Sequence, residues 1–176
     1  EARKGLRVVR LKSGDPRIFS RAGEEISAAR KVGITVKIIP GVTAASAAGA
    51  SLTRSLTERS VANTLVLASG AGCTDDPTPD STRHSSPRTT TALYMSAAGA
   101  ERISHKWMQQ RIPSNNRVDI CIDVSKPSQR HLVATFATVS ETLSENDVNG
   151  CAVLLVTWPK QSAIRPILAQ NYLKYS

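Results

Sequence analysis

The sequence has few aromatic residues, few cysteines and no long apolar run. Phe, Trp and Tyr make up 4% of its 176 residues, which argues against a stacking surface for single-stranded nucleic acid. Its three cysteines and three histidines are scattered, so we expect no zinc site, no disulfide framework and reduced thiols in the cytoplasm. No apolar run approaches the ~18 residues that cross a bilayer, and the first residues lack the apolar core of a signal peptide. We therefore expect no membrane segment.

The charge is strongly basic. The chain has 23 Lys and Arg against 14 Asp and Glu, a formal net charge of +9. This balance favours an acidic partner, which by charge alone is a nucleic acid, an anionic membrane surface or a small polycarboxylate. Hydrophobic residues make up 40% of the chain, which permits one packed domain or two small halves that share a cleft.

The first third of the chain has the pattern of a strand, a turn, a helix and a second strand. Leu6–Leu11 is β-branched and apolar, and Ala22–Val32 has the apolar spacing of one helical face. Gly33 suits the residue after a helix end, and Ile34–Ile39 reads as the next strand. The pattern predicts a βαβ unit in a parallel sheet with a right-handed crossover.

In the remaining chain, segments with the apolar spacing of a helix alternate with segments that have the pattern of a strand. We predict helices over Thr43–Ala50, Ala97–Arg111 and Ser140–Asp147, and strands over Thr64–Ala68, Thr90–Met95, Val118–Val124, Arg130–Val139 and Ala152–Trp158. Val118–Val124 alternates apolar and acidic residues, so we expect it to be half exposed, with Arg130–Val139 as its antiparallel partner. Ser69–Thr89 is polar and reads as an inert loop rather than a lid.

The turn at residues 13–16 can bring backbone close to a ligand. Gly14 has no Cβ, and Pro16 keeps Asp15 extended, so the turn exposes main-chain groups at the end of a strand. The Asp15 carboxylate can accept hydrogen bonds from a ligand or from its own turn, and the local residues favour the second role. By the same reasoning Pro40–Thr43 is a strand-to-helix corner without a ligand.

Longer motifs show a family resemblance. SGDPRIFSRAGEE is similar to the GGDPxxFGRGGEE segment of the uroporphyrinogen-III C-methyltransferases in the tetrapyrrole methylase family. PGVTAASAA matches the family's PGVTAAS stretch, TALYM resembles its TLVFYM strand, and PSQR resembles its turn ending in QR. The likeness covers most of Lys4–Trp158 and is most specific through Ala48. It implies an α/β fold of two halves with a cofactor trough between them, usually as a homodimer.

The resemblance also implies an incomplete first half. The family begins with a strand, a glycine-rich GPGD loop and a region with proposed acid and base residues, none of which has a counterpart here. We expect 1–42 to be the remnant of the first α/β domain, 43–161 to be the second domain with a mixed sheet, and 162–176 to be a basic tail. No catalytic acid or base is assigned, and we expect this chain alone to bind the cofactor weakly and turn over poorly.

The family motifs nominate residues by position. S-adenosylmethionine, held largely by backbone in the family, is expected at Ser13, Gly14, Asp15, Ile18, Thr43, Ala44, Met95 and Val124. Uroporphyrinogen carries eight carboxylates, and guanidinium binds carboxylate bidentately. Candidate residues for binding these carboxylates are Arg17, Arg21, Arg54 and Arg130, although an arginine in such a position is more often a surface charge or a structural pair. No metal is expected.

The implied reaction is methyl transfer to C2 and then C7 of uroporphyrinogen III, giving precorrin-2 for sirohaem and cobalamin. Three alternatives remain: a methylase of a later precorrin, a truncated non-catalytic remnant that dimerises or binds tetrapyrrole, and a basic nucleic-acid binder, which has only its charge in support. The chain departs from the family where Ser13, Ser20, Ala22 and Val124 replace glycines, and where Arg54–Ser55 replaces a His-Arg pair.

Overall fold

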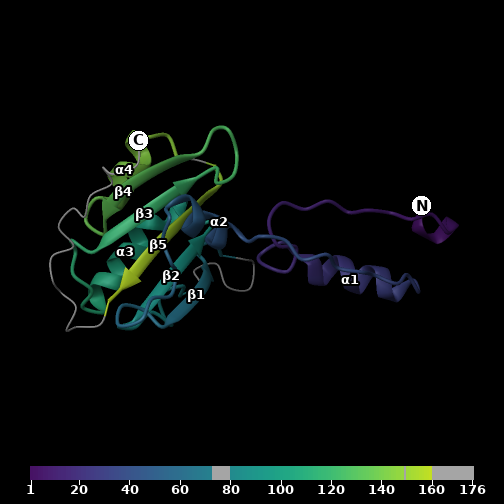
Figure 1. Ribbon diagram of the computed structural model, residues 1–176, viewed down its shortest axis with the longest axis horizontal. Helices are drawn as coiled ribbons and strands as arrows, with labels where there is room; N and C mark the ends of the chain where they lie inside the picture. The colour runs from purple at the N-terminus through teal and green to yellow at the C-terminus, as the bar shows by residue number, and fades with distance from the viewer. Residues whose placement is uncertain (73–79, 149, 160–176) are drawn as a thin grey trace.

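The centre of the molecule is a five-stranded mixed sheet. The computed structural model describes residues 1–72, 80–148 and 150–159. The strands are β1 (Thr64–Ser69), β2 (Thr89–Tyr94), β3 (Arg117–Ile122), β4 (Arg130–Thr135) and β5 (Ala152–Trp158), in the order β1-β2-β5-β3-β4 (Figure 1). β1 and β2 run parallel, and the other neighbours are antiparallel. The five strands predicted after residue 63 are confirmed, including the antiparallel pairing of β3 with β4.

Helices cover both faces of this sheet. α3 (Ala100–Gln109), which follows the turn η2 (Ala97–Gly99), and α4 (Val139–Glu145) pack on one face, and α2 (Ala44–Ser51) packs on the other (Figure 1). These elements confirm the three predicted helices. α3 buries Ile103 and Trp107 in the larger core cluster. α2 approaches its face closely because Ala45 and Ala48 are small.

Residues 1–42 form an N-terminal arm that reaches away from the sheet (Figure 1). It holds the short turn η1 (Ala2–Lys4) and the helix α1 (Ala22–Lys31), which confirms the predicted helix. Glu24 and Glu25 lie in the first turn of α1, where carboxylates suit the positive end of the helix dipole. Gly33 has a φ of +73°, the left-handed conformation expected just after a helix.

The two strands predicted in the arm are wrong. Leu6–Leu11 and Ile34–Ile39 have no strand structure, so the expected βαβ unit does not form. A β-strand needs a neighbour for its backbone hydrogen bonds, and no described residue pairs with either segment. β-branched composition favours a strand, but a ladder also requires a hydrogen-bonded partner.

The expected exposure of Val118–Val124 is also wrong. Residues 118–122 are all buried, because β3 lies between β4 and β5 with helices on both faces. Asp119 is only 1% exposed, and it is tolerated because cationic side chains surround it.

Some expectations fall on residues outside the described ranges. They concern Cys73, the part of the polar loop at residues 73–79, and the basic tail at 162–176. Cys121 and Cys151 are free thiols, and burial raises the pKa of Cys121 to about 11. Within the described part of the chain, no helix combines the length and apolarity needed to cross a membrane.

Candidate functional site

Two backbone turns from distant parts of the sequence meet at one point. The turn at Gly14 lies directly against the corner at Gly41, so that a Cβ added to Gly41 would collide with the carbonyl oxygen of Gly14. Gly14 has a φ of +70°, which side-chain-bearing residues rarely adopt. The two glycines therefore allow main chain to lie against main chain.

Asp15 fixes this meeting point. Its carboxylate accepts a hydrogen bond from the backbone N–H of Arg17 at 2.8 Å and two from the Arg17 guanidinium at 3.2 Å. The N–H of Gly41 also donates to it. Hydrogen bonds from Arg17 hold the pKa of Asp15 below its ordinary value. Asp15 is 8% exposed, so its carboxylate ties down the turn and the corner together.

Tyr94, at the end of β2, joins the corner to the sheet. Its hydroxyl lies 2.5 Å from Oγ1 of Thr43 and accepts a hydrogen bond from the N–H of Ala45 at 3.0 Å. Its ring packs against Phe19 with centroids 4.8 Å apart. Thr43 is the N-cap residue of α2, but its side chain makes no capping bond because it faces Tyr94 instead. One aromatic residue thus contacts both segments that carry the family motifs.

The other nominated cofactor residues lie on the segments that meet at this junction or pack against the same core cluster as Tyr94. Met95 follows Tyr94, is 52% exposed and has a φ of +51°, an unusual conformation for a residue with a side chain. Val124 and Ala44 pack against the same core cluster as Tyr94. Ser13 is exposed in the turn, and Ile18 is half-buried, with its N–H donating to the Asp15 carbonyl oxygen. Two turns, the N-terminus of α2 and the end of β2 therefore meet at the junction, and Val124, which follows β3, packs against the core cluster beneath it.

The four nominated arginines all have partners within the protein. Arg17 pairs with Asp15, and Arg21 pairs with Glu24 at 2.7 Å. Arg54 bonds both Asp119 and Thr157 at 2.6 Å, and Arg130 donates to the carbonyl oxygen of Asn146 at 3.2 Å. Arg17 and Arg21 remain largely exposed, at 61% and 80%, so they also face solvent near the junction.

Arg54 belongs to an ionic cluster on the α2 face of the sheet. Besides Arg54, the buried Asp119 carboxylate binds Arg117 at 2.6 Å and His131 Nε2 at 3.0 Å. Burial alone would raise the pKa of Asp119, but hydrogen bonds and charge from Arg117, with further help from Arg54 and His131, hold it below its ordinary value. The carboxylate links β3, β4 and the segment after α2.

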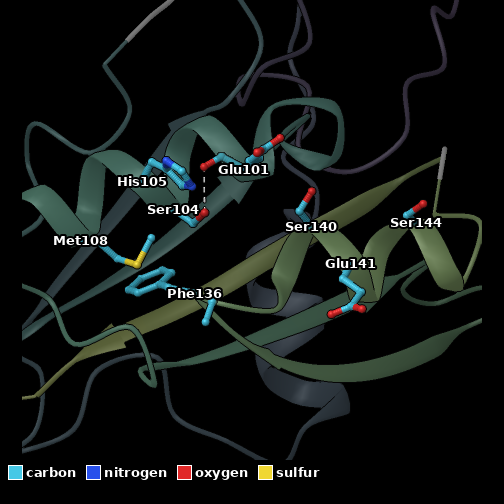
Figure 2. Close-up of a pocket in the computed structure, with 9 residues that line it drawn as sticks. Glu101, Ser104, His105, Met108, Phe136, Ser140, Glu141 and Ser144 are labelled. Atoms are coloured by element: carbon cyan, nitrogen blue, oxygen red, sulfur yellow. Dashed lines mark hydrogen bonds between the residues drawn. The ribbon is translucent and has the colours of Figure 1, made fainter.

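A hollow of the described surface lies elsewhere. It is an open depression of about 410 Å³ between α3 and α4, on the opposite side of the sheet from α2 (Figure 2). Glu101 and His105 come from α3, Glu141 comes from α4, and Phe136 lies between the two helices. Two carboxylates in so shallow a hollow would repel an acidic ligand, so we place the candidate site at the junction of the turns.

Sequence reasoning missed Tyr94, Phe19 and the steric role of Gly41. Tyr94 sits beside Met95 in the TALYM stretch, and Phe19 ends the DPRIF run, so both lie inside motifs that were already singled out. The sequence signal for Tyr94 is an aromatic residue with a polar hydroxyl near the end of a predicted strand. The contact between Gly14 and Gly41 has no signal in the sequence, because it depends on tertiary placement.

Comparison with known protein families assigns the segments that form this site to one family. The family model described as Tetrapyrrole (Corrin/Porphyrin) Methylases matches residues 1–140. The chain therefore belongs to the tetrapyrrole methylase family. The matched range includes the Gly14 turn, the Gly41 corner and Tyr94.

The relatives of this chain include a methyltransferase and a siroheme synthase. The chain is 33% identical over 153 residues to a uroporphyrinogen-III C-methyltransferase of Paracoccus denitrificans, covering 86% of this chain and 53% of that protein. It is 32% identical over 155 residues to a siroheme synthase of Pseudoalteromonas atlantica, covering 88% of this chain and 34% of that protein. The chain thus spans about a third to a half of the length of these relatives.

Solved structures share the fold. The native uroporphyrin III C-methyltransferase of Thermus thermophilus superposes with a TM-score of 0.76 at 28% identity, covering 88% of this chain and 65% of that one. The same enzyme complexed with S-adenyl homocysteine gives 0.75 at 27% identity, covering 88% and 64%. A cobalt precorrin-4 methyltransferase gives 0.78 at 22% identity, covering 89% of this chain and 66% of that one. The α/β fold predicted from the motifs is confirmed.

Proposed function

We propose that the junction of the two turns binds S-adenosylmethionine and that the chain contributes to C-methylation of uroporphyrinogen III at C2 and C7, giving precorrin-2. The observation that carries the proposal is the contact between Gly14 and Gly41, with Tyr94 holding the corner. Family membership and the Thermus complex with S-adenyl homocysteine support it.

The residues at the junction fit such a cofactor. The exposed Ser13–Gly14 backbone offers N–H and C=O groups that hydroxyl and amino groups of the ligand can bond. The half-buried Thr43 lies at the N-terminus of α2, where backbone N–H groups suit the ligand's carboxylate. Met95 offers a polarisable thioether beside an aromatic base. These groups would hold the ligand mainly by main chain.

When bound, the cofactor would supply an electrophilic methyl group to a pyrrole carbon of the substrate. This chain's residues then act by orientation and by excluding water, since proximity supplies much of the rate in such transfers. Tyr94 and Asp15 hold the two turns in their positions relative to each other. The guanidinium groups of Arg17 and Arg21 are exposed, which supports a role in attracting the carboxylates of the substrate.

A mass-spectrometric methylation assay tests the proposal. The full chain is incubated with S-adenosylmethionine and uroporphyrinogen III, and the product is compared with that of the Paracoccus denitrificans relative. We expect slow formation of a species heavier by methyl groups, lost in a Gly41→Ala variant. Methylation of a later precorrin but not of uroporphyrinogen III would favour the second candidate, a later-step methylase. Absence of S-adenosylmethionine binding would contradict both.

A further inference from the structure

The helix α2, whose N-terminus borders the candidate site, has little packing surface of its own. Ala44–Ser51 contains only alanine, serine and glycine, and the residues that it buries are Ala45, Ala48 and Gly49. Small side chains let the helix lie close to the sheet, but each of them buries little apolar area. Apolar contact is also non-directional. The position of α2 along the strands therefore depends on directional polar bonds at its two ends.

Both ends of α2 make such bonds. At the N-terminal end, the Tyr94 hydroxyl lies 2.5 Å from Oγ1 of Thr43 and accepts a hydrogen bond from the N–H of Ala45. At the C-terminal end, the N–H of Arg54 donates to the carbonyl oxygen of Gly49 at 2.9 Å. A Cβ added to Gly49 would lie 3.2 Å from the Arg54 carbonyl oxygen, so this segment folds directly against the last turn of the helix. The backbone of Arg54 is thus closely attached to α2.

The side chain of Arg54 bonds this end of α2 to two strands. One guanidinium nitrogen donates to Oδ2 of Asp119 on β3 and another donates to Oγ1 of Thr157 on β5, both at 2.6 Å. The buried Asp119 carboxylate is held in turn by Arg117 from its own strand and by His131 from β4. The planar fork of arginine suits two acceptors at fixed positions. Arg54 therefore anchors α2 to the centre of the sheet.

The separation of the two anchors matches the length of the helix. Tyr94 lies opposite Val153 on β5, whereas Arg54 bonds Thr157, which is four residues further along the same strand. Four residues of a strand span about 13 Å, and the eight residues of α2 span about 12 Å. One polar anchor at each end therefore holds α2 along β5, and a shift at Arg54 would move the helix start against Tyr94.

We propose that Arg54 is a positioning residue for the cofactor site. By binding Asp119 and Thr157 it fixes the C-terminal end of α2. The N-terminal end, with Thr43 and Ala44, is thereby held where the ligand binds. Sequence reasoning nominated Arg54 for the carboxylates of the substrate, whereas its guanidinium bonds are made inside the protein. The inference rests on the proposed function, because the ligand in question is the S-adenosylmethionine proposed for this site.

Two variants that change partners of the same carboxylate separate positioning from stability. Arg54→Gln removes the ion pair that links Asp119 to α2, and Arg117→Gln removes an ion pair that lies within β3. Arg117 donates two hydrogen bonds to Asp119, and Arg54 donates one. A merely structural role of Arg54 therefore predicts that Arg117→Gln has effects at least as large in every measurement.

The measurements are amide hydrogen–deuterium exchange without ligand and calorimetry with S-adenosylhomocysteine, both on the full chain. The amides of Ala45 and Ala47 report on the start of α2, because they bond Tyr94 and Thr43. We expect Arg54→Gln to speed their exchange at least about tenfold and to weaken ligand binding at least about fivefold. Arg117→Gln should lower the urea midpoint at least as much, but change exchange and affinity by less than about twofold.

Arg54→Lys keeps the test decisive if Arg54→Gln does not fold. Lysine keeps the positive charge but lacks the fork that reaches two acceptors at once. We expect exchange at Ala45 and ligand affinity to lie between those of the wild type and those expected for Arg54→Gln.

Equal exchange at Ala45 in the variants at Arg54 and in Arg117→Gln would overturn the positioning role. Because exchange is measured without ligand, its result is distinguishable from a failure of the proposed function. Absence of S-adenosylhomocysteine binding to the wild type would contradict the proposed function. Faster exchange confined to the variants at Arg54 would still support the role of this residue in holding α2.

Discussion

The Tyr94 hydroxyl lies 2.5 Å from Oγ1 of Thr43 and 3.0 Å from the N–H of Ala45, so a strand end and a helix start share one polar contact. The ring of the same residue packs on Phe19, which follows the Gly14 turn. Tyr94 therefore connects three segments that are distant in sequence. The first two predictions concern this junction.

Replacing Tyr94 with phenylalanine should loosen the corner while keeping the ring contact. We expect a loss of about 1 kcal/mol in the free energy of unfolding, the usual net contribution of a hydrogen bond. Affinity for S-adenosylhomocysteine should fall several-fold, because Thr43 and the start of α2 lose their anchor. Calorimetry and urea unfolding measure the two effects. Ser51→Ala, on the same helix, removes a hydroxyl bond to Ala48 and should leave ligand affinity unchanged.

Gly41→Ala tests the contact of the two turns. Its Cβ would collide with the Gly14 carbonyl oxygen, so the turns must separate, and we expect at least about tenfold weaker binding of S-adenosylhomocysteine. Gly23→Ala is the matched control. A Cβ at Gly23 meets nothing within 4 Å, and alanine favours the helix α1 by about 1 kcal/mol. Equal affinity of the two variants would contradict the assigned geometry.

The buried Asp119 should make the free energy of unfolding depend on pH in the acid range. Its pKa is lowered in the folded state, so its contribution to stability is present above its ordinary value of 3.8 and disappears as the pH falls through the lower folded value. At neutral pH, Asp119→Ala should lower the free energy of unfolding by about 3 kcal/mol. This is the lower end of the range for breaking a buried ion pair, because the arginine partners of Asp119 are partly exposed.

Urea unfolding from pH 7 down to acid measures this contribution. The difference between the wild type and Asp119→Ala should be constant above about pH 5 and shrink below it. A matched control is Asp123→Ala at the exposed ion pair with Lys126, which should change stability by less than about 1 kcal/mol. A wild-type–variant difference that does not vary with pH would show that Asp119 is not the group responsible.

The arginine hypothesis separates into two parts. Arg21→Gln with Arg130→Gln should weaken uroporphyrinogen binding with little change in unfolding, because both side chains are exposed, whereas Arg17→Gln should also loosen the Gly14 turn because it removes two hydrogen bonds to Asp15. Arg54→Gln should instead lower stability, because it leaves Asp119 with one fewer partner. Tryptophan fluorescence or calorimetry with the porphyrinogen measures binding. Unchanged affinity after substitution of all four would remove these residues from the substrate site.

The sequence predicted every strand of the sheet and the four α-helices, because apolar periodicity is strong where elements pack on both sides. It failed at Leu6–Leu11 and Ile34–Ile39, where β-branched residues gave the preference but no described neighbour completes a ladder. Burial of Asp119 was also missed. Alternation of apolar and acidic residues looks the same whether a carboxylate faces water or an arginine supplied by another element.

The sequence predicted which motifs contribute to the candidate site, but not the contacts between them. Gly14, Asp15, Thr43 and Met95 were nominated from family resemblance, and the structure arranges them around one junction. That Asp15 bonds Arg17 and that Gly41 must lack a side chain follow from distances, which motif spacing does not contain. The ion pairs of Arg17 and Arg21 likewise depend on local folding of the turn and of α1.

The most direct test of the central claim is an NMR titration of the ¹⁵N-labelled full chain with S-adenosylhomocysteine. We predict that the amide signals of Gly14, Thr43, Ala45 and Met95 shift together and saturate with one dissociation constant. Signals of Glu101 and Glu141 in the α3–α4 depression should stay unchanged. Shifts confined to that depression, or none at the junction of the two turns, would contradict the account.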